Sequence, residues 1–387
     1  MTVETKSGSS SKDTTAHVNA KTSMYRGGAR WRGKGHWRVK GAANAESHCY
    51  HVMSRTCGGA VRFDDAECEA FQRLMWKMSD FLGVQILTHC VMGNHFHILA
   101  QIPNQAMWLQ RFEGANGEEA LMKHLATFYS RIFMHELKTD LQDMRRLGNE
   151  QQAQERLATF KRRFCDLSIW VKEIKERFGR WYNQRHERKG TLWMERFKSV
   201  LVEDGEALKT MAAYIDLNPV RAKLVSDPKD YRWCGYAEAL SGNPRARQGL
   251  CRIAGAGAGD GSISWDKPVA QGYGSAADLY RMWLFDEGRE RTDRAGALAK
   301  PGLSEETSRN VTDHEQGRLS AAQLLRHRVR HFTQGLALGS REWVETLFQS
   351  HRECFGARRK NGARRLREAA SPLFALRDLP PRKQAGS

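Results

Sequence analysis

Two histidines separated by one residue are the first feature of this sequence that could do chemistry. His95 and His97 stand in an apolar run, residues 91–100, with the sequence Val-Met-Gly-Asn-His-Phe-His-Ile-Leu-Ala. Because side chains alternate across a β-strand, both imidazoles face one side, while Phe96 faces the other and can join a core. Two imidazoles on one strand can hold a divalent metal ion. The alternative is a pair of ordinary strand histidines.

A second segment, residues 211–225, carries a phenol and a carboxamide at helical spacing. Its first half, Met-Ala-Ala-Tyr-Ile-Asp-Leu, favours a helix. Pro219 predicts the end of that helix, because the residue before a proline avoids the α conformation. Tyr214 and Asn218 are four residues apart, so on a helix they share one face and could reach one site. The alternative is a core tyrosine followed by an Asn-Pro helix stop.

Together the two segments resemble the HUH single-tyrosine transposases, and most closely their REP-associated group. The resemblance rests on the His-Phe-His strand and on Tyr-Ile-Asp-Leu-Asn-Pro-Val-Arg at 214–221. Three further blocks match in the same order, at 50–55, 62–71 and 190–202, so the resemblance spans residues 46–240. Gly93 stands where relatives usually carry proline, and Lys223 stands where glycine is common. Compact relatives also lack the helical insertion near 103–168.

The resemblance implies an α+β fold, with a ferredoxin-like antiparallel sheet and helices on one face, which is the HUH endonuclease fold. It implies that Tyr214 is the catalytic nucleophile, which would form a 5′-phosphotyrosine link to DNA and free a 3′-hydroxyl. His95, His97 and Asn218 would be the metal ligands. They would hold Mg²⁺ or Mn²⁺, and a mixed imidazole and carboxamide set suits Mn²⁺ at least as well.

The implied partner is single-stranded DNA with a hairpin or palindrome. The chemistry would be strand cleavage and rejoining, as in a transposase, and it would need no ATP because the bond energy is kept in the phosphotyrosine. The sequence has no phosphate-binding Gly-Lys-Ser/Thr loop, which agrees with this expectation. Monomers and homodimers both occur among such relatives, so the oligomeric state stays open.

The composition points to a polyanionic partner. The chain has 387 residues and a formal net charge of +18. A charge of this size attracts nucleic acid, although an unrelated basic protein is the alternative. No apolar run is long enough to span a bilayer, and no apolar signal segment follows the first residues. The sequence therefore predicts a cytoplasmic protein without membrane contact, and the resemblance adds a bacterial, nucleoid-associated setting.

Four side chains near the proposed site are candidate DNA contacts. Arg196 and Lys198 would hold the strand while Trp193 stacks on a base. Arg221, just beyond the helix stop, would contact a phosphate. Ion pairing on the surface is the alternative for each cation.

The sequence predicts four parts along the chain. Residues 1–45 form a basic arm, predicted to be disordered, in which Arg30 and Arg32 alternate with aromatic residues and could bind phosphates. A solvated arm without that role is the alternative. Residues 46–240 form the catalytic domain, and residues 241–275 are rich in Pro and Gly and predict a linker.

Residues 276–387 predict a basic, helical C-terminal region that could bind DNA. Residues 319–333 predict one helix, Gly335 to Gly339 a turn, and Ser340 to Ser350 a second helix with Ser340 as its N-cap. Two helices about a glycine turn resemble a helix-turn-helix, although simple helical hairpins are commoner.

Two other functions fit part of the pattern. One is a domesticated, sequence-specific DNA-binding protein with little or no catalysis. The other is a replication-initiating or plasmid-mobilising nickase, which usually carries a helicase or a second nearby tyrosine, and neither is evident in this sequence.

Overall fold

The structure of the protein is a computed structural model. It describes residues 38–59, 62–255, 264–265, 275–288, 291–292, 298–300, 335–356, 359–365 and 373–377. Arg30 and Arg32 of the predicted arm, and the helix predicted at 319–333, lie outside these residues. Of the helices that these residues form, none has the length and apolar character needed to cross a bilayer.

A mostly antiparallel sheet is the centre of the described fold. Its strand order is β2-β3-β1-β4-β7-β9-β8, and every neighbouring pair is antiparallel except β4 and β7. Sheet and helices together confirm the predicted α+β class. The strands of this sheet are β1 (Ser47–Arg55), β2 (Gln85–Met92), β3 (His95–Pro103), β4 (Lys198–Val202), β7 (Gly335–Gly339), β8 (Ala363–Arg365) and β9 (Phe374–Arg377).

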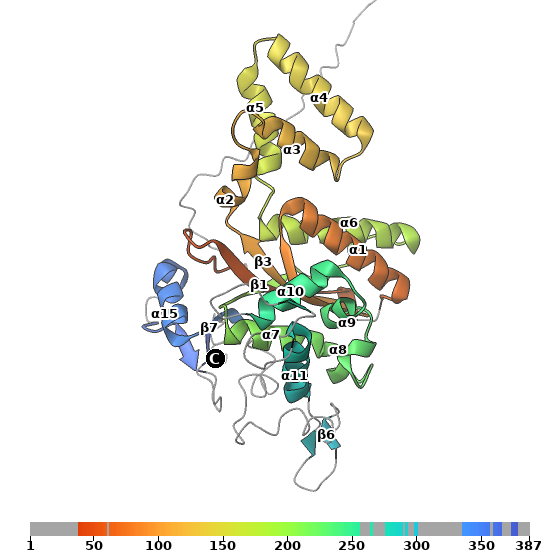
Figure 1. Ribbon diagram of the computed structural model, residues 1–387, viewed down its shortest axis with the longest axis vertical. Coiled ribbons are helices and arrows are strands. Elements are labelled where there is room, and N and C mark those ends of the chain that lie inside the picture. The colour runs from red at the N-terminus through yellow and green to blue at the C-terminus, as the bar shows by residue number, and fades with distance from the viewer. Residues whose placement is uncertain are drawn as a thin grey trace, which may run out of the picture. The chain divides into compact units, whose positions relative to one another are not determined.

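Helices stand between the strands along the chain, with α2 to α6 between β3 and β4 (Figure 1). A separate small sheet pairs β5 (Arg291–Thr292) with β6 (Leu298–Lys300). The α-helices are α1 (Asp65–Leu82), α2 (Gln105–Leu109), α3 (Gly117–Ala126), α4 (Arg131–Arg146), α5 (Glu150–Lys161), α6 (Leu167–Arg185), α7 (Glu206–Asp216), α8 (Asn218–Arg221), α9 (Gly235–Leu240), α10 (Pro244–Ala254), α11 (Ala276–Gly288) and α15 (Arg341–Ser350). Short 3-10 turns are η1 (Cys57–Gly59), η2 (Gln110–Phe112), η3 (Pro228–Asp230) and η4 (Arg352–Cys354).

Helices cover both faces of the sheet, so the expectation of helices on one face is wrong. Phe96 of β3 packs on Phe71 of α1, with ring centroids 4.7 Å apart. His97, its neighbour on the strand, points to the other face and contacts Tyr214 of α7. In Figure 1, α1 and α6 accordingly lie on one side of the strands, and α7, α8 and α11 on the other. The alternating strand pattern thus has an apolar partner layer on each side.

Local signals in the sequence explain where α1 begins and ends. Asp64 is its N-cap and forms a reciprocal capping box with Glu67. Gly83 ends the helix in the left-handed conformation at φ 71°, which a residue without Cβ adopts at no cost.

The predicted helical insertion is present as α2 to α5. Met134, Leu137 and Leu141 of α4 are buried, as are Ala153 and Leu157 of α5, and the two helices contact one another. Aromatic stacking ties the insertion to α1, since Phe81 stacks on His124 and on Phe128. The insertion is therefore anchored to the sheet layer by its own small core.

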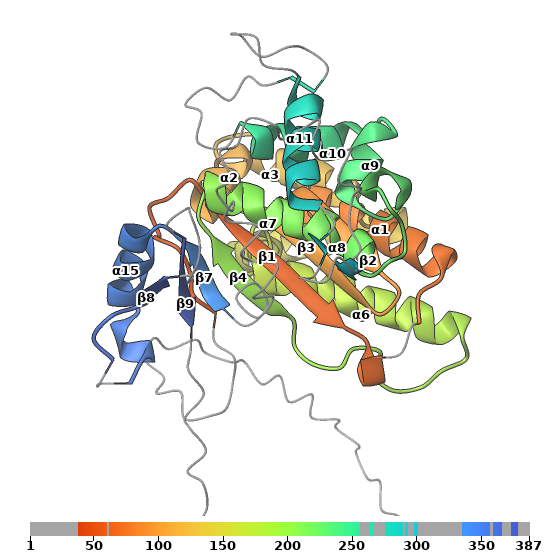
Figure 2. The ribbon, with the colours of Figure 1, turned by 90° about the horizontal axis from the view of Figure 1, so that it is seen from below.

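The C-terminal region differs from the expectation of a helical region. Residues Gly335–Gly339, predicted as a turn, form β7, which pairs with β4 and β9. The helix that follows is present as α15, with Ser340 as its N-cap. A helix-turn-helix is therefore absent from residues 335–350, because the small residues of this segment complete a sheet instead of a turn. Figure 2 shows β7, β8, β9 and α15 beside β4.

The predicted linker 241–275 is also partly structured. Helix α10 occupies Pro244–Ala254 and buries Leu250 and Ile253. It contacts β2, α9 and α11. The Pro and Gly residues that suggested a linker include the first residue of this helix, a position that proline favours.

Candidate active site

Three histidines, from two neighbouring strands, lie on one face of the sheet. In the register of β1 and β3, Met53 is opposite His97, and Arg55 is opposite His95. His51, two residues before Met53, faces the same side, and its Nε2 lies 2.8 Å from Nδ1 of His97. The two rings lie edge to edge along this contact, with centroids 5.1 Å apart and planes 16° from parallel. Sequence reasoning missed His51, although it stands inside the first-strand block, because the sequence does not give the register of β1 on β3.

Tyr214 of α7 completes this cluster. Its ring packs edge-on against His97, with centroids 5.7 Å apart, and against His51 at 6.0 Å. Tyr214, His51 and His97 are all buried. The fold therefore brings together the two segments that the sequence singled out.

Buried polar contacts fix the orientation of α7. Asp216, two residues after Tyr214, accepts hydrogen bonds from the hydroxyls of Thr88 at 2.8 Å and Tyr280 at 2.5 Å, and from the backbone N–H of Tyr236 at 3.1 Å. These donors belong to β2, α11 and α9, so the end of the tyrosine helix is bound to three other elements.

The protonated nitrogen of His95 follows from its neighbour. The amide of Asn94 is oriented by its Nδ2, which donates to the backbone carbonyl of Gly59 at 2.6 Å. Its Oδ1 therefore faces Nδ1 of His95, at 2.5 Å. Because a carbonyl oxygen only accepts, Nδ1 must carry the proton, and Nε2 of His95 keeps a lone pair.

Burial keeps both histidines neutral and the phenol protonated at pH 7. It lowers the pKa of His95 to about 4 and lowers the pKa of His97 well below its usual value, with the charge of Arg55 acting in the same direction. Burial raises the pKa of Tyr214, while Arg221 and Arg55 oppose that shift. Neutral imidazoles are the form that binds a metal, and a buried phenol needs help to ionise.

The donor set of His95 and His97 fits a divalent cation. Both rings are neutral and each has Nδ1 engaged in a hydrogen bond, which leaves Nε2 as the nitrogen for a metal. Within the described part of the chain, no group of three His, Cys, Asp or Glu side chains is placed to hold a metal ion.

Asn218 is not placed as the sequence predicted. The expectation put it on one helical face with Tyr214, but α7 ends at Asp216, as Pro219 predicted, and Asn218 begins α8. Its Nδ2 donates to the backbone carbonyls of Tyr214 at 2.9 Å and Ile215 at 3.1 Å. The side chain thus caps the end of α7, and only Oδ1 remains as a ligand atom.

Three cationic residues lie near this cluster. Arg221 lies over the ring of Tyr214, 4.6 Å from its centroid, and its Nη1 donates to the Tyr214 carbonyl at 2.9 Å. Arg55 is exposed beside His95, and Lys198 of β4 is opposite Met53. The side chains of Arg55, Lys198 and the exposed Arg196 have no hydrogen bond or ion pair with any described residue. Arg55 was not predicted, because its position depends on the strand register.

Trp193 is a core residue, so its predicted role in stacking on a base is wrong. Only 8% of it is exposed. Its ring packs against Phe63, Phe96 and Phe178, and its Nε1 donates to the backbone carbonyl of Lys175 at 2.9 Å. A ring enclosed in this way has no face left for a base.

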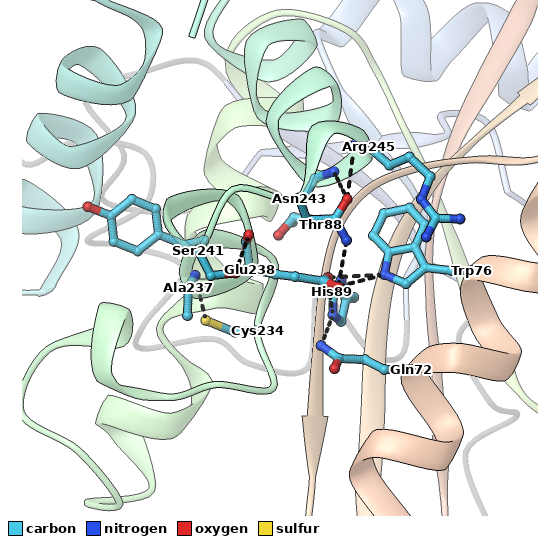
Figure 3. Close-up of polar contacts among 12 residues, drawn as sticks. Gln72, Trp76, Thr88, His89, Cys234, Ala237, Glu238, Ser241, Asn243 and Arg245 are labelled. Atoms are coloured by element: carbon cyan, nitrogen blue, oxygen red, sulfur yellow. Dashed lines mark hydrogen bonds and ion pairs between the residues drawn. The ribbon is translucent and has the colours of Figure 1, made fainter. Parts of the chain in front are cut away.

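A second cluster of polar side chains lies between α1 and α9, and its hydrogen bonds join elements of the fold (Figure 3). Buried His89 of β2 accepts a hydrogen bond from Gln72 at 2.9 Å, and Glu238 accepts from Trp76 at 3.0 Å. The hollow above it holds three acidic and three basic side chains, so it offers no net attraction to a polyanion. Those charged residues are Glu69, Asp80, Glu238, Arg73, Lys77 and Arg245.

No family model matches this sequence, and no curated protein matches it. A solved structure of a REP-associated tyrosine transposase bound to a REP hairpin is similar in part, at 13% sequence identity. The match covers 55% of this chain and 86% of that one, with a TM-score of 0.32. A TM-score of this size does not establish a common fold, so function rests on the residues of this chain.

Proposed function

We propose that the protein is a single-tyrosine DNA strand transferase, a transposase that cleaves and rejoins single-stranded DNA. The observation that carries this proposal is the ring contact of Tyr214 with buried His97 and with its hydrogen-bonded neighbour His51, which come from segments distant in sequence. A tyrosine beside an imidazole that can bind a metal is suited to nucleophilic attack on a phosphodiester.

In the proposed reaction, the Oη of Tyr214 loses its proton and attacks the phosphorus atom of the scissile phosphate. The bond between phosphorus and the 3′-oxygen breaks, and that oxygen leaves as a hydroxyl after taking up a proton. The downstream DNA segment is then linked to the tyrosine through its 5′-phosphate, and the upstream segment carries the free 3′-hydroxyl. Attack by a 3′-hydroxyl on this link reverses the step and joins the strands without ATP.

His95 and His97 would hold the divalent metal through Nε2, and Asn218 would be the third ligand through Oδ1. When bound, Mg²⁺ or Mn²⁺ supplies positive charge at the phosphate oxygens and favours the phenolate form of the nucleophile. Two imidazole ligands favour Mn²⁺ over the harder Mg²⁺.

The substrate is proposed to be single-stranded DNA next to a hairpin. Arg55, Lys198 and Arg196 have no described partner, and together with Arg221 they offer cations for consecutive phosphates around Tyr214. A net charge of +18 would draw in any nucleic acid, so the geometry at the site has to select the strand.

The proposed ferredoxin-like core is the part of the sheet formed by β2, β3, β1 and β4 in that spatial order. Along the chain its first elements follow as β1, α1, β2 and β3.

Covalent capture tests this function. Full-length protein is mixed with Mn²⁺ and labelled single-stranded hairpins taken from the flanks of its own gene, and the products are separated on a denaturing gel. We expect a protein–DNA adduct that requires the metal and is lost in Tyr214→Phe and in His95→Ala.

Tyr182→Phe is the matched control, because Tyr182 is a buried tyrosine of α6, on the opposite face of the sheet. It should form the adduct at the rate of the parent protein. Cleavage without an adduct would indicate a hydrolytic nuclease, and tight binding without cleavage across the hairpin panel would indicate a DNA-binding protein without catalysis.

A further inference from the structure

We propose that His51 is a positioning residue for the metal site, and that its Nε2 accepts a hydrogen bond from the Nδ1–H group of His97. This contact would fix Nε2 of His97 as the metal-binding nitrogen. The inference rests on the proposed function, because it concerns the metal held by His95 and His97.

The hydrogen bond between the two rings allows only two arrangements. A neutral imidazole carries one proton, so either His97 donates from Nδ1 or His51 donates from Nε2 across the 2.8 Å contact. If His51 donates, Nε2 of His97 carries the proton of that ring and has no lone pair for a metal. If His97 donates, its Nε2 is available. Metal binding therefore selects the arrangement in which His51 accepts.

His95 and His97 are held in the same manner. Nδ1 of His95 donates to Oδ1 of Asn94, which the Gly59 carbonyl keeps in place. Nδ1 of His97 has His51 as its partner. An acceptor behind each ring fixes both its tautomer and its direction, as is usual for histidines that bind metals.

Packing suits His51 to this role. The ring is 1% exposed, lies edge to edge with His97, and makes a perpendicular ring contact with Tyr214. Because its Nε2 is used by His97, His51 is not placed to share the metal through that nitrogen. A hydrogen bond inside such packing leaves the ring of His97 little freedom to turn.

The test is the affinity of the full-length protein for Mn²⁺ alone, measured from the EPR signal of the free ion. His51→Leu fills the space but cannot accept a proton, and we expect it to weaken Mn²⁺ binding about 10- to 100-fold. His51→Gln places a carbonyl oxygen near the position of Nε2, and we expect affinity within about threefold of the parent, since the acceptor is restored.

His48→Leu is the matched control, because His48 lies three residues before His51 on β1, which puts it on the opposite face of the sheet, and it bonds to the Ala42 carbonyl. It should leave Mn²⁺ affinity unchanged. Equal Mn²⁺ affinity in the parent and His51→Leu would overturn this inference and leave the proposed function standing. The same holds if His51→Gln binds Mn²⁺ as weakly as His51→Leu while circular dichroism shows that both variants are folded. A parent protein without a saturable Mn²⁺ site would overturn the proposed metal-dependent function together with the inference.

Discussion

The position of the proposed nucleophile depends most directly on one buried carboxylate. Asp216 is fully buried, and its three hydrogen bonds join α7 to β2, α9 and α11. Burial outweighs these hydrogen bonds and raises the pKa of its carboxyl from 3.8 to about 6. Folding therefore favours the protonated acid, which differs from the usual behaviour of a paired carboxylate.

This raised pKa predicts how Asp216→Asn changes stability with pH. Below about pH 3 the carboxyl is protonated in both states and costs nothing. As pH rises from about 3 to 6, the unfolded state ionises first, so the parent protein loses stability, and above about pH 6 nearly the full cost remains. Asn does not titrate, so the difference in unfolding free energy should move in favour of the variant by about 3 kcal/mol between pH 3 and 7.

Urea unfolding of parent and variant at a series of pH values measures this difference. The buried histidines titrate in both proteins and therefore cancel from it. A difference that stays constant with pH, or that moves in favour of the parent as pH rises, would contradict the raised pKa of Asp216.

At the level of single residues, the sequence identified candidate side chains better than it identified what surrounds them. His95, His97 and Tyr214 could be proposed from strand alternation and from a helix that ends before Pro219. His51 could not, because its contact with His97 crosses two strands whose register is set by tertiary packing. Trp193 was expected to stack on a DNA base, because its neighbours in the sequence do not show that three aromatic rings enclose it in the folded protein.

At the level of elements, strand pairing decides which cations face the site. Arg55 ends β1 directly opposite His95, and Lys198 begins β4 opposite Met53. Lys198, Met53 and His97 thus lie in one row across the three strands, and Arg55 and His95 form the neighbouring row. No helix is needed to place them, because a register of β1 against β3 and β4 is sufficient.

Arg55→Ala should therefore weaken the binding of single-stranded DNA and reduce its dependence on salt. Losing one phosphate contact lowers the slope of log affinity against log salt by about 0.7. Arg73→Ala is the control, because Arg73 is exposed on α1, which packs on the opposite face of the sheet. Fluorescence anisotropy across a salt series measures both slopes, and equal slopes in the two variants would remove Arg55 from the DNA-binding surface.

The elements themselves were predicted unevenly. Helix α15 was expected at its observed limits, because Ser340 supplies a clear N-cap signal and bonds to the backbone N–H of Trp343. The strand β7 was expected as a turn, since Gly-Leu-Ala-Leu-Gly has strong turn residues at both ends and only three apolar residues between them. Its pairing with β4 and β9 supplies the stability that its sequence lacks.

At the level of the whole molecule, the C-terminal region completes the sheet that carries the candidate site. β7 pairs in parallel with β4, the strand next to β1. Glu203, just after β4, accepts hydrogen bonds from the backbone N–H and the hydroxyl of Ser340, and it thereby links β4 to the start of α15. A C-terminal region that followed a linker, as the sequence suggested, would not share backbone pairing with the sheet that carries the candidate site.

Removal of residues 335–387 should consequently damage the whole protein and not only its affinity for DNA. The truncation leaves the edge of β4 unpaired and removes the cover of Val202, and an exposed apolar edge strand invites association between chains. We expect an aggregated or strongly destabilised product by size-exclusion chromatography and circular dichroism.

Ser340→Ala in the full chain is the milder companion to this truncation. It removes the N-cap of α15 and the hydroxyl bond to Glu203, and it should cost about 0.5–2 kcal/mol of unfolding free energy while the protein stays monodisperse and forms the adduct. If instead the truncated chain is monodisperse, folded and able to form the Tyr214 adduct at the parent rate, the C-terminal strands are an accessory to the sheet. The integrity of the site would then depend on β1 to β4 and α7 alone.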